Sequence, residues 1–530
     1  MTAWHQLKNA LSNGKVGRRQ FLQQASALGV SAAIAGPFAA GVGHAATPKS
    51  GGRLRVGLSA GSTTDTMDPG LGGSNGYMSI LTYATNNHLG DVGNSGVLEP
   101  ELAESWEVTD RATKWTFKLR KGVEFHNGKT LHADDVVASF NYHRSENSKS
   151  KGKALLADVE EIKADGPDTV TFRLKTGNAD FNYTASETQF SIMPSEEGKV
   201  DWANGIASGP YMLQDFDPGV RAFAIRNPNY WKEGRPYFDE LELLSIADHN
   251  ARSTALISGT VDVIDRVDPK TAHLLERQEH IKVEETKGML HYTFPMMADV
   301  APFDSKDVRL ALKYAFDREQ MVKTIFNGHG SVGNDHPFST VSPYYNAELE
   351  QRQYDPDKAR FHMKRAGHDS LAVSIHAADA AFLGAVDTCV LYREQAAKAG
   401  IDIKVVREPS DGYWSNVWSK KPWSAAYWLG RASADSMLFL GYGRDATWND
   451  THWEHDRFRK LAHEARAESD EAKRREMYQE IQVIIRDEGS VIIPMFGNYI
   501  FASSTKLQHG EMRGDRDLDG QKFTERWWFS

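Results

Sequence analysis

The stretch that decides the fold begins with LEPELAESWE at residues 98–107 and continues as WTFKLRKGVEFHNG at 115–128 and ADDVVASF at 133–140. Apolar and polar residues alternate over 115–120, which is the period of a half-buried β-strand. Glycines frame residues 122–128 and give the backbone the freedom that a hairpin turn needs. Carboxylates near the start of 133–140 favour the first turn of a helix.

Strands and helices alternate along the rest of the chain. Further strands are predicted at residues 53–59, 170–175 and 491–496. One helix is predicted from about Asp307 to Phe326, with Asp304 or Ser305 as its cap and Gly328 after its end. A second helical block covers about 456–486, with a break near Asp470. This mixture predicts an α/β protein.

Three more segments follow in a set order along the chain. They are SGPY at 208–211 with RNPNYW at 226–231, VRLALKYAFDRE at 308–319, and YDPDKAR at 354–360. Together with the first stretch they resemble the peptide/nickel class of extracytoplasmic solute-binding proteins of ABC importers, called family 5. The same residues also have structural readings, and Arg309, Asp317 and Arg318 are interpreted as stabilising residues.

The resemblance implies a two-lobed periplasmic-binding-protein fold with an additional domain inserted in the first lobe. Lobe one is expected at 47–95, 205–290 and 500–530, the inserted domain at 96–204, and lobe two at 291–499. The chain is expected to cross between the lobes near 288–292 and 495–500. The lobes would close over a ligand, and the closed form of this expected monomer would be recognised by ABC transporter permease subunits in the inner membrane.

The first 46 residues predict a twin-arginine (Tat) signal peptide. GRRQFL at 17–22 precedes a small, apolar run that is too short to span a membrane, and GHAA at 43–46 is typical of a cleavage site. The alternative, a buried or amphipathic N-terminal helix, is disfavoured because Gly36-Pro37 would break it. Export by the Tat machinery, cleavage near Ala45 or Ala46 and a periplasmic location are therefore expected.

Composition narrows the function classes. A chain of 530 residues with 40% hydrophobic residues is typical of soluble globular material in two or three domains. Residues 1–46 hold four basic and no acidic residues, so their removal changes the formal charge from −9 to −13. This acidity disfavours nucleic acid as a partner. The single cysteine, Cys389, cannot form an internal disulfide, and no cofactor is indicated.

Three motifs that suggest chemistry lack the context that the chemistry requires. Ser59 lies in a G-x-S-x-G pattern, but a loop and no helix follows it. GHGSVG at 328–333 follows a helix, whereas a phosphate-binding loop joins a strand to a helix. His452 and His455 have no third metal ligand at suitable spacing. No catalytic or metal site is predicted, and a secreted hydrolase or metalloenzyme is the alternative from another class.

The segment from Asp411 to Trp453 is rich in tryptophan and tyrosine, and about half of these rings are expected to line a cleft. The resemblance adds a specific site, because peptide-binding relatives carry an aspartate for the peptide's ammonium group after a segment like YWLG at 427–430. Here Arg431 stands at that position. The predicted ligand-binding residues are Arg431, Trp428, Gly430, Asp435, Trp448, Tyr77, Asn75, Phe294 and Met296.

A guanidinium at this position repels an ammonium group and favours a carboxylate or phosphate. The sequence therefore predicts a binding protein for a small organic ligand that carries an anionic group. In a second reading, Arg431 pairs with Asp435 and the site is neutral. A di- or oligopeptide, a metal chelate and an opine-like solute remain alternatives within the same class.

Overall fold

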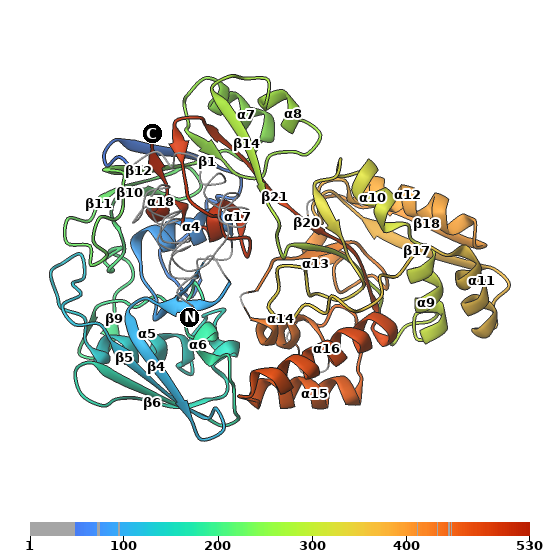
Figure 1. The fold of residues 1–530 in the computed structure, drawn as a ribbon, viewed down its shortest axis with the longest axis horizontal. Coiled ribbons are helices and arrows are strands. Elements are labelled where there is room, and N and C mark those ends of the chain that lie inside the picture. Colours follow the sequence, from blue (N-terminus) through green and yellow to red (C-terminus); the bar gives the residue numbers. More distant parts are fainter. Residues whose placement is uncertain are drawn as a thin grey trace, which may run out of the picture.

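The computed structural model describes residues 48–71, 75–93, 96–410, 412–431, 433–443, 446 and 448–530. Strands and helices are mixed throughout, which confirms the predicted α/β class. Figure 1 shows two halves, one built of the blue and green segments with the red C-terminal segments, and one built of the yellow to red segments. The predicted signal peptide lies outside the described residues.

Three larger sheets organise the chain, and the parts that contain them are called the first lobe, the small domain and the second lobe below. The domain limits expected from the sequence stay a prediction. The sheet of the first lobe has the order β10-β11-β12-β1-β13-β21-β14. Its strands are β1 (Arg53–Leu58), β10 (Tyr211–Asp217), β11 (Arg221–Arg226), β12 (Glu240–Ser245), β13 (Val263–Ile264), β14 (Ile281–Thr286) and β21 (Tyr499–Ser504).

Strand β1 lies inside this sheet, in parallel register with β12 and β13. Its apolar residues Leu54, Val56 and Leu58 are fully buried, which explains the alternation seen in the sequence. They pack in one core with residues of helix α4, so the first strand of the chain lies in the centre of this lobe. The helices of the first lobe are α4 (Gly76–Thr85), α7 (His249–Ile257) and α8 (Ala272–Leu275).

The small domain is an antiparallel sheet of order β4-β5-β7-β6 with its own aromatic core. The strands predicted at 115–120 and 170–175 are confirmed as β5 and β7, and the helix predicted from 133 is confirmed as α5. Its elements are β2 (Gly90–Val92), β3 (Leu98–Pro100), β4 (Ala103–Thr109), β5 (Lys114–Leu119), α5 (Ala133–Arg144), η1 (Lys153–Leu156), β6 (Val159–Ala164), β7 (Thr169–Leu174), α6 (Phe181–Thr184), β8 (Ser195–Glu196) and β9 (Lys199–Val200).

The second lobe contains a sheet of order β16-β20-β15-β19 and a parallel pair, β17 and β18. Its strands are β15 (His291–Pro295), β16 (Gly330–Val332), β17 (Leu371–Ala377), β18 (Ile401–Arg407), β19 (Ala426–Trp428) and β20 (Val491–Gly497). Its helices are α9 (Lys306–Tyr314), α10 (Arg318–Thr324), α11 (Pro356–Arg365), α12 (Ala385–Ala397), α13 (Tyr413–Asn416), α14 (Ala434–Gly441), α15 (Asp456–Ala467) and α16 (Glu471–Glu488).

The single helix predicted over 307–326 is wrong, because the chain forms α9 and α10 with a break between them. The side chain of Asp317 accepts from the backbone N–H of Gln320 and starts α10 as a new helix. Ser305 caps α9, as one of the two predicted candidates. The predicted break near Asp470 is confirmed, since that residue caps α16.

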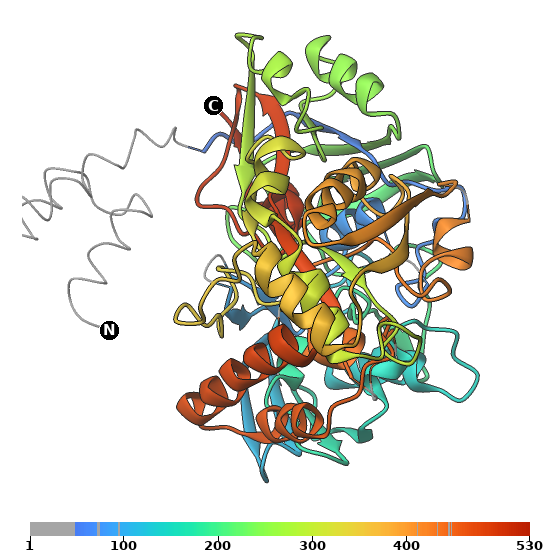
Figure 2. The same ribbon diagram turned by 90° about the vertical axis from the view of Figure 1, so that its right-hand side faces the viewer.

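The chain passes between the two large sheets twice, from β14 to β15 and from β20 to β21. Figure 2, turned by 90°, shows the red strands β20 and β21 running as one continuous path through the molecule. These passages coincide with the stretches expected to join the lobes. None of the helices in the described ranges combines the length and apolar character needed to cross a bilayer. The C-terminal elements are β22 (Leu507–Gln508), α17 (Asp517–Gly520), α18 (Phe523–Arg526) and β23 (Trp528–Phe529).

Candidate ligand-binding cavity

A cavity of about 580 Å³ lies between the two lobes, and it is called the inter-lobe cavity below. This volume is in the range of about 300–1,000 Å³ that is usual for small-molecule sites. The second lobe contributes Trp414, Trp418, Tyr427, Trp428, Leu429, Arg431, Ser436, Leu440 and Trp448. The first lobe and the C-terminal segment contribute Asn75, Gly76, Ser79, Arg266, Tyr499, Arg516, Asp517 and Gln521. The small domain contributes Lys151, Ala154, Leu155, Glu187, Thr188 and Gln189.

Five aromatic side chains of the second lobe form one side of the cavity, which we call the aromatic wall: Trp414, Trp418, Tyr427, Trp428 and Trp448. The rings contact one another in series. Trp414 lies 5.8 Å from Trp418, which lies 6.4 Å from Trp428, and Trp428 lies 6.1 Å from Trp448, between ring centroids. The side chains of Trp414 and Trp448 remain 40% and 46% exposed, so they offer apolar surface to a ligand.

Two arginines from opposite lobes line the cavity. Arg266 follows β13 and is exposed, whereas Arg431 follows β19 and donates to the carbonyl oxygens of Gly430 at 3.0 Å and Leu429 at 3.4 Å. Within the described ranges, no ion pair joins either guanidinium to a carboxylate. Burial lowers the pKa of Arg431, and attraction by Glu187 opposes this shift.

A third arginine is already neutralised. Arg516 lies 3.1 Å from the carboxylate of Glu187 and donates to the hydroxyl of Thr188 at 2.6 Å, so it joins the C-terminal segment to the small domain. Four cationic and two anionic residues line the cavity, and its formal charge is therefore +2. An aromatic wall in a cavity of net positive charge suits an organic anion.

Four of the predicted ligand-binding residues line the inter-lobe cavity, namely Asn75, Trp428, Arg431 and Trp448. Asn75 is held in place from two sides. Its side-chain oxygen accepts from the backbone N–H of Met78 at 2.9 Å and so caps α4, and its amide nitrogen donates to Asp65 at 2.7 Å. That any of the four contacts a ligand stays a prediction.

Gly430 and Asp435 lie beside the cavity without lining it. A Cβ at position 430 would lie 2.7 Å from the carbonyl oxygen of Asp515, so glycine permits the second lobe to approach the C-terminal segment. Asp435 lies 3.4 Å from the guanidinium of Arg466, and the predicted alternative pairing with Arg431 is therefore wrong. Burial raises the pKa of Asp435 to about 6, although Arg466 opposes the shift.

Tyr77, Phe294 and Met296 do not line the cavity, and for these three residues the sequence prediction needs correction. All three are fully buried in hydrophobic cores. Tyr77 donates to the backbone oxygen of Leu243 at 3.2 Å and packs under the first sheet. Phe294 and Met296 belong to the core of the second lobe, because β15 is an inner strand whose apolar side chains are covered.

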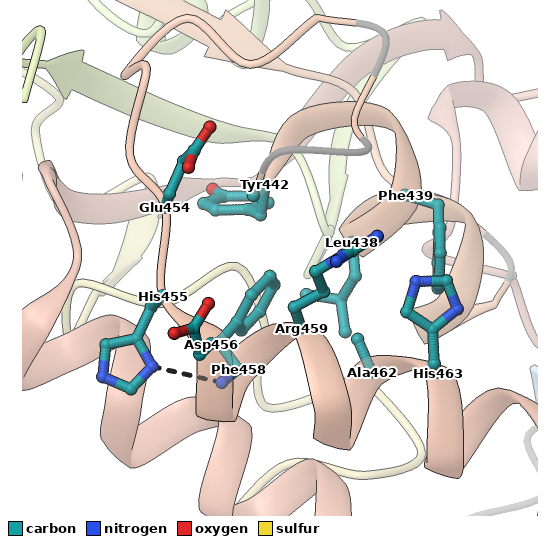
Figure 3. A pocket seen from close by; sticks show the side chains of 11 residues that line it. Leu438, Phe439, Tyr442, Glu454, His455, Asp456, Phe458, Arg459, Ala462 and His463 are labelled. Carbon is teal, nitrogen blue, oxygen red and sulfur yellow. Dashed lines mark hydrogen bonds between the residues drawn. The ribbon is translucent and has the colours of Figure 1, made fainter.

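A separate hollow lies between α14 and α15, on the second lobe (Figure 3). Its volume of about 20 Å³ matches one water molecule and no organic ligand. In Figure 3, His455 is turned to the start of α15, where its ring nitrogen accepts from the backbone N–H of Phe458 at 3.1 Å. His452 pairs with Asp299 at 2.9 Å. No cluster of three metal-ligating side chains occurs in the described part of the chain.

Several cavity residues were not predicted from the sequence, among them Arg266, Glu187, Arg516 and Asp517. They belong to three separate segments that only the folded arrangement brings together. No local motif surrounds them. The signals in the sequence were the aromatic-rich stretch 411–453 and the family-like YWLG segment, and both point to the second lobe only.

Comparison with known proteins agrees with this architecture. Residues 97–450 match the model of the bacterial extracellular solute-binding proteins, family 5 Middle. The chain is 26% identical over 438 residues to the dipeptide-binding protein of Escherichia coli, covering 76% of this chain and 81% of that protein. It is 31% identical over 304 residues to heme-binding protein A of Haemophilus influenzae, covering 51% of this chain. That match spans about half the length of the heme-binding protein, 54%.

Among solved structures, the periplasmic binding protein DppA of Helicobacter pylori, in complex with the peptide STSA, has the same fold. The TM-score is 0.77 at 21% identity, over 91% of this chain and 99% of that chain. The fold is therefore the predicted two-lobed binding-protein fold. The chain belongs to the bacterial extracellular solute-binding proteins of family 5, the family that the sequence resembles. Both of these relatives are binding proteins.

Proposed function

We propose that this protein captures a small organic anion in the inter-lobe cavity and delivers it to the permease of an ABC importer. The observation that carries the proposal is a cavity of about 580 Å³ whose lining comes from both lobes. A ligand that contacts both lobes makes all of its contacts only when they are closed. Its binding free energy then shifts the population to the closed form, which the permease recognises.

The charge of the cavity supports an anionic ligand. Among the described residues, Arg431 donates to the backbone carbonyls of Leu429 and Gly430 and to no carboxylate, and Arg266 reaches the same cavity from the other lobe. Two unit charges 4 Å apart interact by about 4 kcal/mol at an effective dielectric constant of 20, so a free ammonium group beside Arg431 would be disfavoured by a similar amount. A peptide with such an ammonium group is the second candidate, since a dipeptide-binding protein is among the relatives. A metal chelate is a third.

Calorimetry tests the choice of ligand. We expect the purified protein to bind carboxylated or phosphorylated small molecules or acidic sugars, and Arg431→Asp to weaken that binding at least about tenfold, which corresponds to 1.4 kcal/mol. Lys420→Asp is the matched control, because it makes the same charge change at an exposed position outside the cavity. Unchanged preference between peptides and anions in Arg431→Asp would refute an anionic ligand. Time-dependent conversion of a bound compound would instead favour the secreted-hydrolase alternative.

The twin-arginine signal also belongs to this proposal. Residues 1–46 direct Tat export, and the mature protein acts in the periplasm as a monomer. Changing both Arg18 and Arg19 to lysine should leave the precursor in the cytoplasm, whereas Lys8→Gln should not. Cell fractionation measures the outcome, and export of the double variant at the normal rate would contradict the route.

A further inference from the structure

Asp450 lies directly behind the aromatic wall, outside the cavity. It belongs to the loop between α14 and α15, and only 5% of the residue is exposed. Its carboxylate accepts a hydrogen bond from the indole nitrogen of Trp418 at 2.9 Å. The indole of Trp428 faces the same carboxyl and, as a hydrogen-bond donor, lowers its pKa. One buried acid therefore contacts two of the four tryptophans that line the cavity.

An indole N–H only donates hydrogen bonds, and an ionised carboxylate only accepts them, so the groups are complementary. Charge-assisted hydrogen bonds of this kind are stronger than neutral ones. The two rings held by Asp450 are in turn packed on the outer members of the wall. Trp418 contacts Trp414, and Trp428 contacts Trp448. Holding Trp418 and Trp428 in place therefore also limits the positions of Trp414 and Trp448, whose rings are exposed to the ligand.

The surroundings of Asp450 contain no strong counter-charge. Within the described ranges, no ion pair joins this carboxylate to a lysine, an arginine or a histidine. The titratable groups that act on it are His452 in the same loop and Tyr442 at the end of α14. His452 is paired with Asp299. The hydroxyl of Tyr442 is buried and has no hydrogen-bond partner among the described residues.

We propose that Asp450 is a positioning residue, which orients Trp418 and Trp428 through their indole N–H groups and thereby sets the affinity of the aromatic wall for its ligand. This inference rests on the proposed function of the cavity. A buried carboxyl without a cation is costly to ionise, and burial raises the pKa of Asp450 to about 7 against the hydrogen bonds from the two indoles. Protonation removes the charge that strengthens both hydrogen bonds, so the wall is ordered above this pH and loosened below it.

Tryptophan labelled with ¹⁵N at the indole nitrogen provides a readout that needs no ligand. In NMR spectra of the whole protein, the indole N–H signals of Trp418 and Trp428 should shift together with a midpoint near pH 7, and Asp450→Asn should abolish the shift. Trp418→Phe removes one donor from the ionised carboxylate and should move the midpoint to higher pH. Trp414→Phe, the matched control, changes a wall residue that contacts Trp418 but is not hydrogen-bonded to Asp450 among the described residues, and it should leave the midpoint in place.

A single His452→Asn variant excludes the neighbouring histidine as the source, and the titration should persist in it. The proposal is overturned if the shift survives in Asp450→Asn, disappears in His452→Asn, or keeps its midpoint in Trp418→Phe. The asparagine side chain in Asp450→Asn has nearly the same shape as the aspartate that it replaces. A circular dichroism spectrum of the variant checks that it folds.

The second readout is the affinity for 8-anilinonaphthalene-1-sulfonate, an aromatic anion that suits the wall and the arginines. We expect the wild type to bind this dye about tenfold more tightly at pH 8 than at pH 6, and Asp450→Asn to lose the pH dependence. Equal pH profiles in both proteins would overturn the role of Asp450. Failure of the wild type to bind any organic anion would count against the proposed function. The titration of the indole N–H signals needs no ligand, so it would still test whether Asp450 positions the two rings.

Discussion

Individual buried side chains decide how the second lobe holds together. Lys313 of α9 is fully buried, and its ammonium group donates to the carbonyl oxygens of Gly489 at 2.8 Å, Arg486 at 2.9 Å and Ile485 at 3.3 Å. These carbonyls belong to the end of α16, where backbone oxygens have no partner within the helix. Lys313, on α9, therefore caps the C-terminal end of α16.

We expect Lys313→Met to lower the free energy of unfolding by about 1–3 kcal/mol, because it leaves the buried carbonyl of Gly489 without a donor, whereas Arg352 and the backbone N–H of Gly489 still donate to the other two carbonyls. Burial lowers the pKa of Lys313 from 10.5 to about 7. Between these pH values the unfolded chain binds more protons, so the contribution of this group to stability rises with pH, by up to about 1.4 kcal/mol per pH unit.

Melting temperatures measured from pH 7 to 9 test this sign. The difference between wild type and Lys313→Met should widen as the pH rises. Lys364→Met, at an exposed position of α11, is the control and should follow the wild type. Parallel curves for Lys313→Met and the wild type would contradict the depressed pKa.

At the scale of elements, the caps explain where helices begin. The stretch 307–326 has one continuous apolar pattern, yet it forms two helices because Asp317 caps the second. The side-chain oxygen of Asp317 accepts from the N–H of Gln320 at 2.9 Å. Its backbone N–H donates to the side chain of Gln395 on α12 at 2.9 Å, which ties the break to the next layer.

Asp317→Ala should therefore lower the stability by about 1 kcal/mol, the usual value for loss of an N-cap. Glu319→Ala is a suitable comparison, because it also removes a negative charge from the first turn of α10 but leaves the cap intact. Its effect should be about 0.3–1 kcal/mol or less at this exposed position. Thermal unfolding of both variants gives the answer, and equal losses would assign the effect to charge alone.

Sequence patterns predicted elements better than they predicted the site. The strand β5 was predicted from the alternation of apolar and polar residues, and the helix α5 from the carboxylates in its first turn. Both are local properties of the sequence. Trp428 and Arg431 were found through a short motif. Arg266 was missed because its place in the cavity depends on how β13 packs in the sheet. The residues next to Arg266 in the sequence give no indication of that packing. Phe294 shows the opposite error. It was predicted to contact the ligand, but it is an apolar residue in the core of the second lobe.

At the scale of the whole molecule, a second contact joins the lobes away from the two chain passages. Arg474 of α16 forms an ion pair with Asp180 of the small domain, and both side chains are almost fully buried. Beside it, the backbone N–H of Ala179 donates to the carbonyl oxygen of Arg466 at 2.7 Å. Figure 1 shows α6 next to α14, α15 and α16, away from the β20–β21 passage. We expect these contacts to act as a latch that holds the small domain against the second lobe.

Asp180→Asn should weaken this latch, since it leaves the buried guanidinium of Arg474 without its charged partner. The free protein should then populate open forms more, and small-angle scattering should show a larger radius of gyration. Ligand affinity should fall by the same factor as the closed population. Asp158→Asn is the control, because Asp158 is 42% exposed and lies 3.6 Å from Arg466. A scattering curve of Asp180→Asn identical to that of wild type would show that the ion pair does not hold the lobes.

The position of β1 has a consequence for how the protein is made. This strand lies beside β13, and β13 pairs with β21, which comes from the last part of the chain. The ribosome must therefore finish almost the whole polypeptide before the first sheet can close, whereas the sheet of the second lobe uses strands from a single continuous stretch. Because part of the core around β1 comes from the C-terminal segment, the apolar face of this earliest strand stays partly uncovered until synthesis is nearly complete, and we expect it to be a binding site for chaperones during synthesis.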